Sequence, residues 1–420
     1  KPILINGVRQ VGKTWIVKNF GGNNFETMIY INFDTEPSYC DIFKKSKNPE
    51  KIIFELSLIF HHKIDIENTL FFFDEIQECN EALNSLKYFY ESESGYNVIA
   101  AGSYLGITLS KGSSFPVGKV DIIEMRPMTY KEFLLANDED MLVDYMEKYN
   151  EKISITEPIF QKMMLYFREY YIVGGMPEAV SKWVQEKNVD SIEKVQINIL
   201  NSYQRDFAKY PERRIMPKII DVWEAVVGQL SRENKKFKYS EIKKSARARE
   251  YEEALNWLIA GNYIKKVSRV SKPLIPLKIY SDERNFKIYF ADTGLLRAKA
   301  EYPASAFSEI NDNKNFQFKG VLAENVVLQE LECISTKSIY SLSTVNNEID
   351  FIIQVDQKIY PVEVKYGNNI HSKSLTKFLK GNTDIIGIRY SMKNLSFDGR
   401  ILNIPFPMIS ETIRLIRNFV

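Results

Sequence analysis

Eight residues near the start of the chain, positions 7–14 (GVRQVGKT), constrain its fold more than any other segment. They follow the pattern G-x-x-x-x-G-K-[ST], in which backbone N–H groups surround phosphates, the lysine neutralises phosphate charge and the hydroxyl binds Mg²⁺. The apolar run at 3–5 precedes the pattern as a strand would, and residues 15–20 follow it as a helix would. Because a helix start also attracts anions, this context argues against a chance match in a glycine-containing turn. We therefore predict a loop that binds a nucleoside triphosphate.

The residues of this loop have distinct expected roles. Lys13 is the expected catalytic cation beside the β- and γ-phosphates, and Thr14 is expected to bind Mg²⁺ through its hydroxyl. Ser103, at the end of a later apolar run, would hydrogen-bond the γ-phosphate or the attacking water, with a simple turn residue as the alternative. The full set expected to contact ATP is Gly7, Arg9, Gln10, Val11, Gly12, Lys13, Thr14, Trp15 and Ser103.

Three further apolar runs, at residues 28–33, 69–73 and 98–101, follow the loop and end in polar residues. Continuous apolar runs separated by helix-length segments predict parallel strands that are buried on both faces. Ligands bind at the carboxyl edge of such a sheet. The fold class expected for this part of the chain is therefore α/β, with the parallel sheet of a P-loop NTPase.

The second of these runs ends in Asp74-Glu75. Next to a P-loop, Asp74 would hold Mg²⁺ through its water shell. Glu75 would orient and polarise the water that attacks the γ-phosphate, which makes it the expected catalytic base. The alternative is an acidic pair that caps the following helix, predicted at 76–92.

Phosphoryl transfer also uses a cation directed at the γ-phosphate. Arg9, Lys119 and Arg126 are candidates, each of which is also readily explained as an ordinary surface charge. A second subunit is a further source of such a cation. The sequence does not indicate which of the three residues, or a second subunit, supplies this cation.

Length and composition limit the classes of protein to which the chain can belong. A chain of 420 residues is expected to form two or three domains, and 45% apolar with 26% charged residues is typical of a globular protein. The net charge is only +2, but residues 201–270 hold 16 Lys and Arg against 9 Asp and Glu. This basic region is either a solvated surface or a contact with nucleic acid.

Cysteine usage and hydropathy indicate a cytoplasmic protein. Cys40, Cys79 and Cys333 fit no metal-ligand spacing and are expected to be reduced. With three histidines, a zinc site is not expected. No apolar stretch reaches the ~18 residues of a membrane helix, and no signal peptide is visible. Because the chain begins with Lys1 almost inside the first predicted strand, we expect a further segment to precede it.

The chain's motifs, and their order along the sequence, resemble those of a family of bacterial and archaeal AAA-type P-loop ATPases close to the STAND class. The C-terminal half of these proteins is a domain of unknown function related to the PD-(D/E)xK restriction-endonuclease-like fold. The matching stretches are GVRQVGKT, LFFFDEIQ, AAGSYLGI, EMRPMTYKEF, YYIVGGMPEAV, KIYFADTGLL, KGVLAENVVLQEL and EIDFIIQVDQKIYPVEVKYG. They extend over nearly the whole chain. The resemblance implies ATP and Mg²⁺ as ligands.

The chain departs from this family at one position. The family commonly has Gly-Arg before the proline-containing segment, whereas this chain has Gly118-Lys119. An arginine sensor is therefore not expected there, because lysine cannot form a two-pronged contact.

The middle of the chain is predicted to be mainly helical. Residues 130–200 contain few Gly or Pro, and the segment 170–177 (YYIVGGMP) interrupts them as a turn. The resemblance allows a nucleotide-sensing role for this turn, and a hinge without chemistry is the alternative favoured here. Residues 215–270 read as two helices followed by a strand, with a capped helix start at 239–242 and a second helix at about 247–260. This order fits a winged helix, which either contacts DNA through Arg247 and Arg249 or serves as a packing module.

A second group of reactive side chains lies near the C-terminus. Residues 348–355 alternate as a half-buried strand, Asp356-Gln357 forms a turn, and residues 358–365 return. With the turn at the centre of the hairpin, Asp350 lies directly opposite Glu363 and shares a face with it. Lys365, two residues further along, lies on the same face.

These residues form the D…E-x-K arrangement of restriction-endonuclease-like nucleases. Two carboxylates would hold Mg²⁺, and the lysine would position the attacking water or stabilise the phosphorane charge. Glu324, in an amphipathic helix predicted at 321–331, would complete this nuclease site. The alternative is a cross-strand ion pair on a solvent-facing surface.

Four domains are expected: an ATPase core at 1–135, a helical lid or linker at 136–210, a winged-helix-like module at 211–300 and a nuclease-like domain at 301–420. We expect an ATPase coupled to a nuclease-like domain that acts on DNA. The alternative is a STAND-type nucleotide-dependent switch, whose C-terminal half recognises a protein partner or another copy of the chain without cleaving anything. A C-terminal domain that has lost its activity is the third reading.

Overall fold

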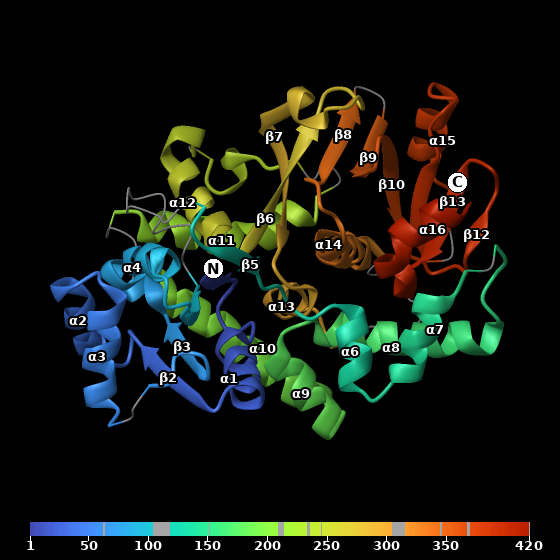
Figure 1. Ribbon diagram of the computed structural model, residues 1–420. Coiled ribbons are helices and arrows are strands. Elements are labelled where there is room, and N and C mark those ends of the chain that lie inside the picture. The colour runs from blue at the N-terminus through green and yellow to red at the C-terminus, as the bar shows by residue number, and fades with distance from the viewer. Residues whose placement is uncertain are drawn as a thin grey trace. The chain divides into compact units, whose positions relative to one another are not determined.

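The structure is a computed structural model that describes residues 1–61, 64–103, 118–150, 152–208, 214–232, 236–244, 246–304, 316–344, 347–367 and 370–419 (Figure 1). It forms two compact units. The first comprises Lys1–Arg126 with the short segment Trp257–Tyr263, and the second comprises Pro127–Asn256 with Ile264–Val420. No helix in the described part of the chain combines the length and the apolar character needed to cross a membrane.

The first unit contains a five-stranded sheet with the order β2-β3-β4-β1-β5, in which all neighbours are parallel. Its strands are β1 (Ile3–Asn6), β2 (Thr27–Asn32), β3 (Thr69–Asp74), β4 (Asn97–Gly102) and β5 (Asp121–Glu124). Its helices are α1 (Lys13–Asn24), α2 (Cys40–Lys45), α3 (Pro49–Ile59) and α4 (Asn80–Glu91), with short 3-10 turns at Pro37–Tyr39 and Ile76–Glu78. The predicted parallel α/β sheet is confirmed.

Both faces of this sheet are covered by helices, as the continuous apolar strands require. Phe71 and Phe73 of β3 pack on one side against residues of α2, α3 and α4. Leu70 and Phe72 point to the other side and pack with Val17 of α1. Since side chains alternate along a strand, a strand buried on both faces must be apolar at every position. The layers place the carboxyl ends of β1 and β3 beside the start of α1.

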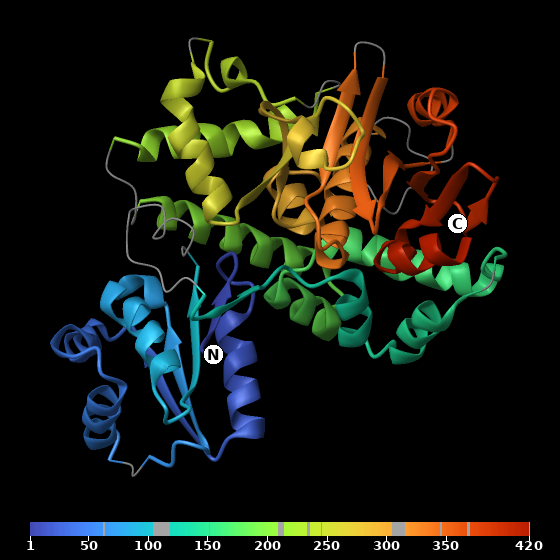
Figure 2. The same ribbon diagram turned by 45° about the horizontal axis from the view of Figure 1, so that its top comes forward.

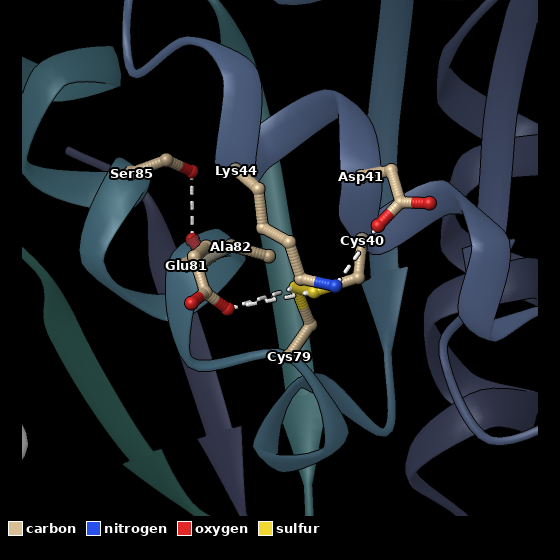
Figure 3. Close-up of a disulfide and its surroundings, with 7 residues drawn as sticks. All are labelled: Cys40, Asp41, Lys44, Cys79, Glu81, Ala82 and Ser85. Atoms are coloured by element: carbon tan, nitrogen blue, oxygen red, sulfur yellow. Dashed lines mark hydrogen bonds and ion pairs between the residues drawn. A yellow bond between two sulfur atoms is a disulfide. The ribbon is translucent and has the colours of Figure 1, made fainter.

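One expectation about the cysteines is wrong. Cys40 at the start of α2 and Cys79 just before α4 form a disulfide, with Glu81 beside it (Figure 3). The two cysteines are 39 residues apart in sequence. They meet because β2 and β3 are neighbours in the sheet, so the segments that leave their carboxyl ends lie side by side. Cys333, in α14, is exposed and is not in a disulfide.

The second unit begins with helices and ends with a large sheet. Its helices are α6 (Tyr130–Ala136), α7 (Asp140–Lys148), α8 (Glu157–Val173), α9 (Pro177–Glu186), α10 (Val189–Phe207), α11 (Met216–Leu230), α13 (Thr293–Lys299), α14 (Phe316–Ile334), α15 (Lys373–Lys380) and α16 (Thr412–Phe419). Helix α12 (Ala248–Ala260) extends from this unit into the segment grouped with the first. Short 3-10 turns lie at Tyr239–Glu241, Leu277–Tyr280 and Phe406–Glu411.

The large sheet has eight strands in the order β12-β13-β11-β10-β9-β8-β6-β7. Its strands are drawn in yellow to red in Figure 2. They are β6 (Ile264–Val270), β7 (Ser281–Phe290), β8 (Tyr340–Thr344), β9 (Asn347–Val355), β10 (Lys358–Lys365), β11 (Gly387–Ser391), β12 (Ser396–Phe397) and β13 (Ile401–Pro405). Strand β6, expected to follow the two helices of a winged-helix module, belongs to this sheet together with β7, because β6 pairs with β8 through Arg269 and Val270 and with β7 along its length. A separate winged helix is not shown.

The turn predicted at 170–177 is a closely packed junction. Helix α8 ends at Val173, Gly174 has a φ of 74°, and α9 begins at Pro177. The Asp292 carboxylate accepts hydrogen bonds from the backbone N–H of Gly175 (2.6 Å) and of Leu295 (2.8 Å). A Cβ on Gly175 would collide with the backbone of Met128. The glycines are therefore needed for close backbone approach.

Helix α14 carries a buried polar row that joins several elements of the second unit. Asn325 accepts a hydrogen bond from the backbone N–H of Phe290 (2.8 Å). Gln329 accepts one from the Thr293 N–H (3.1 Å). Glu330 accepts one from the Tyr130 N–H (2.8 Å). Because an unpaired buried polar group is costly, these pairings fix the position of the helix. Much of the motif KGVLAENVVLQEL therefore has a structural role.

Candidate functional site

Lys13, the first residue of α1, is held beneath the phosphate-loop segment. Its Nζ donates hydrogen bonds to the carbonyl oxygens of Gly7 (2.8 Å) and Val8 (3.1 Å) and to Oγ of Ser103 (2.9 Å). The side chain is only 6% exposed. Burial lowers the pKa of Lys13 to about 8, although the carboxylates of Glu75 and Asp74 oppose the shift. A phosphate placed here would bring negative charge next to Nζ and favour the protonated form of Lys13.

The backbone of the loop explains its glycines. Gly12, at the N-cap of α1, has a φ of 97°, and Gln10 also has a positive φ, of 65°. A Cβ on Gly7 would collide with the carbonyl of Met125, because β5 runs alongside β1. Gly12 has no side chain to cap α1, so the first N–H groups of the helix remain able to bind an anion.

Thr14 and Asp74 are in direct contact. The Thr14 hydroxyl donates a hydrogen bond of 2.7 Å to Oδ2 of Asp74, which also accepts one of 3.2 Å from the Tyr30 hydroxyl. Asp74 is 2% exposed at the end of β3. A hydroxyl and a carboxylate that share one position can both offer oxygen atoms to Mg²⁺, which prefers such ligands. The residues present therefore fit a magnesium ion at this point.

Glu75 follows Asp74 in a left-handed conformation, with a φ of 49°. Its Oε2 accepts a hydrogen bond of 2.6 Å from the side-chain amide of Gln77. The carboxylate is close enough to Lys13 to raise that residue's pKa. A residue in this sparsely populated backbone region is commonly associated with function. Gln77 was not expected in the site, and its conformation depends on the 3-10 turn at Ile76–Glu78 that the sequence did not reveal.

The other expected loop residues lie around this centre. Val11 is buried, Arg9 is half-buried and Gln10 is exposed. Trp15 is 71% exposed on the outside of α1. Of the candidate cations, Lys119 forms an ion pair of 3.4 Å with Glu91 and lies over the ring of Tyr90. Arg126 is half-buried just after β5. The part of the stretch AAGSYLGI beyond Ser103, and Val117 before Gly118, lie outside the described residues.

The predicted hairpin of β9 and β10 is confirmed with its register. Val355 pairs with Lys358 and Phe351 with Val362, so the two-residue turn is at Asp356-Gln357. Asp350 and Glu363 are the next residues on the two strands. Oδ2 of Asp350 accepts a hydrogen bond of 2.9 Å from the Val364 N–H. Lys365 Nζ lies 2.8 Å from Oε1 of Glu363. The hairpin thus brings together the three residues it was expected to.

Four more side chains join these three: Glu348 from β9, Glu324 from α14, and Lys287 and Tyr289 from β7. We call the whole group the acid cluster: Glu324, Glu348, Asp350 and Glu363 with Lys287, Tyr289 and Lys365. Tyr289 donates a hydrogen bond of 3.2 Å to Glu324 Oε2. Lys287 Nζ lies 2.7 Å from Glu348 Oε1 and 3.9 Å from Asp350 Oδ1. Lys287, Tyr289 and Glu348 were not predicted. The sequence signal for Lys287 is a charged residue within the apolar run at 286–290.

The charges of the acid cluster perturb one another. Burial raises the pKa of Glu363, against the opposing effect of Lys365, and the neighbouring Glu324 raises it further. Burial alone would lower the pKa of Lys287, but Glu324, Asp350 and Glu348 reverse this and hold the pKa above its usual value. Four carboxylates against two lysines leave two negative charges. Within the described residues, Oε2 of Glu363 is buried and accepts no hydrogen bond.

The acid cluster is not a preformed metal cage. Among the residues that the structure describes, the group of three or more potential ligand atoms lying within 4.8 Å of one another is Cys40, Cys79 and Glu81. Both sulfurs of that group are joined in the disulfide, so they are not available to a metal. In the acid cluster, Lys287 and Lys365 contact carboxylates that would otherwise be metal ligands. The excess negative charge and the orphan Glu363 oxygen still fit a divalent cation.

Comparisons with known families divide the chain into three parts. Residues 1–134 match the model of an AAA domain. Residues 164–306 match a domain of unknown function (DUF8612), and residues 319–409 match another (DUF4143). No curated protein matches the chain.

Several solved structures are similar at low sequence identity. A Walker-type ATPase of Pyrococcus abyssi is 14% identical over 71% of this chain and 91% of its own, with a TM-score of 0.43. A STAND protein with a tetratricopeptide repeat sensor from Pyrococcus horikoshii is 12% identical over 80% of this chain and 43% of its own, with a TM-score of 0.26. Cdc6p from Pyrobaculum aerophilum is 12% identical over 73% and 87%, with a TM-score of 0.22. These values carry no residue's role over to this chain. The match of residues 1–134 to the AAA domain model and the parallel sheet that they form support a P-loop ATPase fold for this part of the chain.

Proposed function

We propose that the first unit binds ATP with Mg²⁺ and hydrolyses it. The observation that carries this proposal is the 2.7 Å contact between Thr14 and Asp74, with Glu75 next in the chain and the Lys13 ammonium beneath the loop. Two oxygen ligands, a cation and a carboxylate base are the groups that phosphoryl transfer requires. They come from the end of β3 and the start of α1, at the carboxyl edge of the sheet.

Each side chain would have one task. The loop amides and the first N–H groups of α1 would bind the phosphates. Lys13 would exchange its contacts with the Gly7 and Val8 carbonyls for contacts with phosphate oxygens, while Ser103 would remain within reach of the γ-phosphate. Thr14 and Asp74 would hold Mg²⁺, which would offset the charge that develops on the phosphate oxygens. Glu75, oriented by Gln77, would align the attacking water.

The test is the rate of ATP hydrolysis by the Glu75→Gln variant. We expect turnover to fall by about 100-fold or more, because a general base typically contributes that much, while ATP still binds. Glu78→Gln, an exposed change three residues away, is the matched control and should leave turnover unchanged. Undiminished turnover in Glu75→Gln would exclude this base.

A second proposal concerns the acid cluster, which we suggest binds Mg²⁺ and cleaves DNA. Glu324, Asp350 and Glu363 would be the metal ligands, and Lys365 would hold the attacking water or the developing charge. The two surplus negative charges and the unpaired Glu363 oxygen support this assignment. Since Lys287 contacts Glu348 and lies near Asp350, metal binding would require a small rearrangement of these side chains.

Incubation of plasmid and linear DNA with the protein and Mg²⁺ tests this second proposal. Glu363→Gln should abolish cleavage, while Asp356→Asn, in the turn of the same hairpin, should not. Failure of the intact protein to cut any DNA would leave the C-terminal part as a recognition module. In that case the protein fits a nucleotide-dependent switch, and Lys13→Ala should alter a protein complex, such as a homo-oligomer, without changing DNA affinity.

A further inference from the structure

A small pocket beside the acid cluster is lined by a positively charged group of side chains. It has a volume of about 220 Å³, and its polar lining includes Lys236, Arg269, Lys287, Ser341, Ser343 and Glu348. These residues come from β6, β7, β8 and β9 and from the segment that precedes the 3-10 turn at Tyr239–Glu241. The four strands belong to one half of the large sheet (Figure 1). We call this the basic pocket.

We propose that the basic pocket binds a phosphate group of a DNA strand held at the acid cluster. Three cations against one carboxylate give the lining two surplus positive charges, the opposite of the acid cluster next to it. An ion of complementary sign is the expected occupant of such a cavity. The choice of a DNA strand rests on the second proposed function, whereas the choice of an anion rests on the pocket alone.

Arg269 is the residue best suited to the phosphate. It is half-buried on β6, directly in register with Ser341 of β8 and with Asp282 of β7. In the described part of the chain its guanidinium forms neither an ion pair nor a hydrogen bond, although its charge lowers the pKa of Asp282, after that residue's hydrogen bonds. A guanidinium offers paired donors that match two oxygens of one phosphate.

Two serines line the basic pocket together with Arg269. Ser341, 3% exposed, pairs with Arg269, and Ser343 pairs with Glu348 of β9. Hydroxyls and guanidinium groups are the usual partners of the phosphate backbone, which carries charge but no sequence information. The pocket is therefore suited to holding a strand in place and not to reading its bases.

Lys287 connects the pocket to the acid cluster. Its side chain is 5% exposed, it lines the pocket, and its Nζ lies 2.7 Å from Glu348 Oε1 and 3.9 Å from Asp350 Oδ1. A phosphate in the pocket would therefore lie next to the carboxylates that we assign to metal binding. A strand that crosses both sites would place one phosphate in the pocket and a neighbouring one at the acid cluster.

The test compares single-stranded DNA binding by the intact chain and two variants. Arg269→Ala removes the guanidinium from the pocket, and Arg284→Ala removes an exposed arginine from β7, outside the lining. Binding is followed by fluorescence anisotropy of a labelled oligonucleotide in EDTA, which prevents cleavage. We expect Arg269→Ala to weaken binding several-fold and to reduce the slope of log affinity against log salt by about 0.7, the value for one lost contact to single-stranded DNA. Arg284→Ala should match the parent.

Two results would overturn the proposal. The first is equal DNA affinity and equal salt slope for the parent and both variants. The second is equal DNA affinity with a loss of inorganic phosphate binding in Arg269→Ala by calorimetry, which would mean that the pocket takes free phosphate and not a strand. Cleavage is a separate readout. If Arg269→Ala weakens binding although the parent never cuts DNA, the pocket stands and the nuclease proposal fails.

Discussion

Raising the pH should weaken nucleotide binding through Lys13. In the nucleotide-free protein, burial under the phosphate loop lowers the pKa of Lys13 to about 8, despite the nearby Glu75 and Asp74. Phosphates placed beside Nζ favour the charged form and therefore raise this pKa in the complex. Between the two pKa values the complex holds one more proton than the free protein. Binding must then take up a proton, and affinity must fall as the pH rises.

The size of the effect follows from the pKa of the free protein. One unit above it, about 90% of the free protein has a neutral Lys13, so binding should take up about 0.9 proton per nucleotide. Each further pH unit should weaken binding about tenfold, or about 1.4 kcal/mol, until the pKa of the complex is reached. From about one unit below this pKa downward, the same group contributes little pH dependence, because it is then charged in both states.

Calorimetry with ADP in two buffers of different ionisation enthalpy measures both the affinity and the proton uptake. Lys13→Arg is the control, since a guanidinium remains charged and its affinity should not follow this pH dependence. The reasoning is refuted if the parent protein binds equally well at about pH 8 and at about pH 9.5 without taking up protons.

Three further predictions concern stability. Burial raises the pKa of Glu330 from 4.5 to about 7, so the stability that this carboxyl contributes is present below pH 4.5 and declines as the pH rises to 7. Glu330→Gln should therefore stabilise the protein above pH 7 by up to about 3 kcal/mol. Equal melting temperatures of parent and variant at pH 8 would contradict this. Reduction of Cys40–Cys79, which closes a loop of 39 residues, should lower the free energy of unfolding of the first unit by up to about 4 kcal/mol in denaturant titrations, whereas identical curves with and without reductant would contradict it. Gly175→Ala should destabilise the protein by about 3 kcal/mol, because the added Cβ would collide with backbone atoms. Gly228→Ala, with open space around it, should be neutral or stabilising by up to about 1 kcal/mol. Similar melting temperatures for both variants would refute this.

Local patterns predicted much of both candidate sites. The parallel sheet of the first unit follows from strands such as β3, where Phe71 and Phe72 must both be apolar because helices cover both faces. The hairpin of β9 and β10 follows from a two-residue turn, since a turn of known length sets every cross-strand pair. In both cases the information lies within a few residues of the chain.

Features that depend on distant pairing were not predicted. Lys287 reaches the acid cluster because the β6–β7 hairpin joins the large sheet, with a register shift between Ser268 and Arg269. A local pattern indicates such a hairpin but not the sheet to which it belongs. The Cys40–Cys79 bond likewise depends on β2 and β3 being neighbours, which the spacing of the two cysteines does not reveal.

The membership of β6 and β7 in the large sheet determines where the chain can be divided for expression. A fragment that starts after residue 300 would leave the edge of β8 without its neighbour β6, and unpaired strand edges promote aggregation. It would also lack Lys287 and Tyr289, so an assay of that fragment would report on a different group of side chains. A useful C-terminal fragment must therefore begin upstream of Ile264.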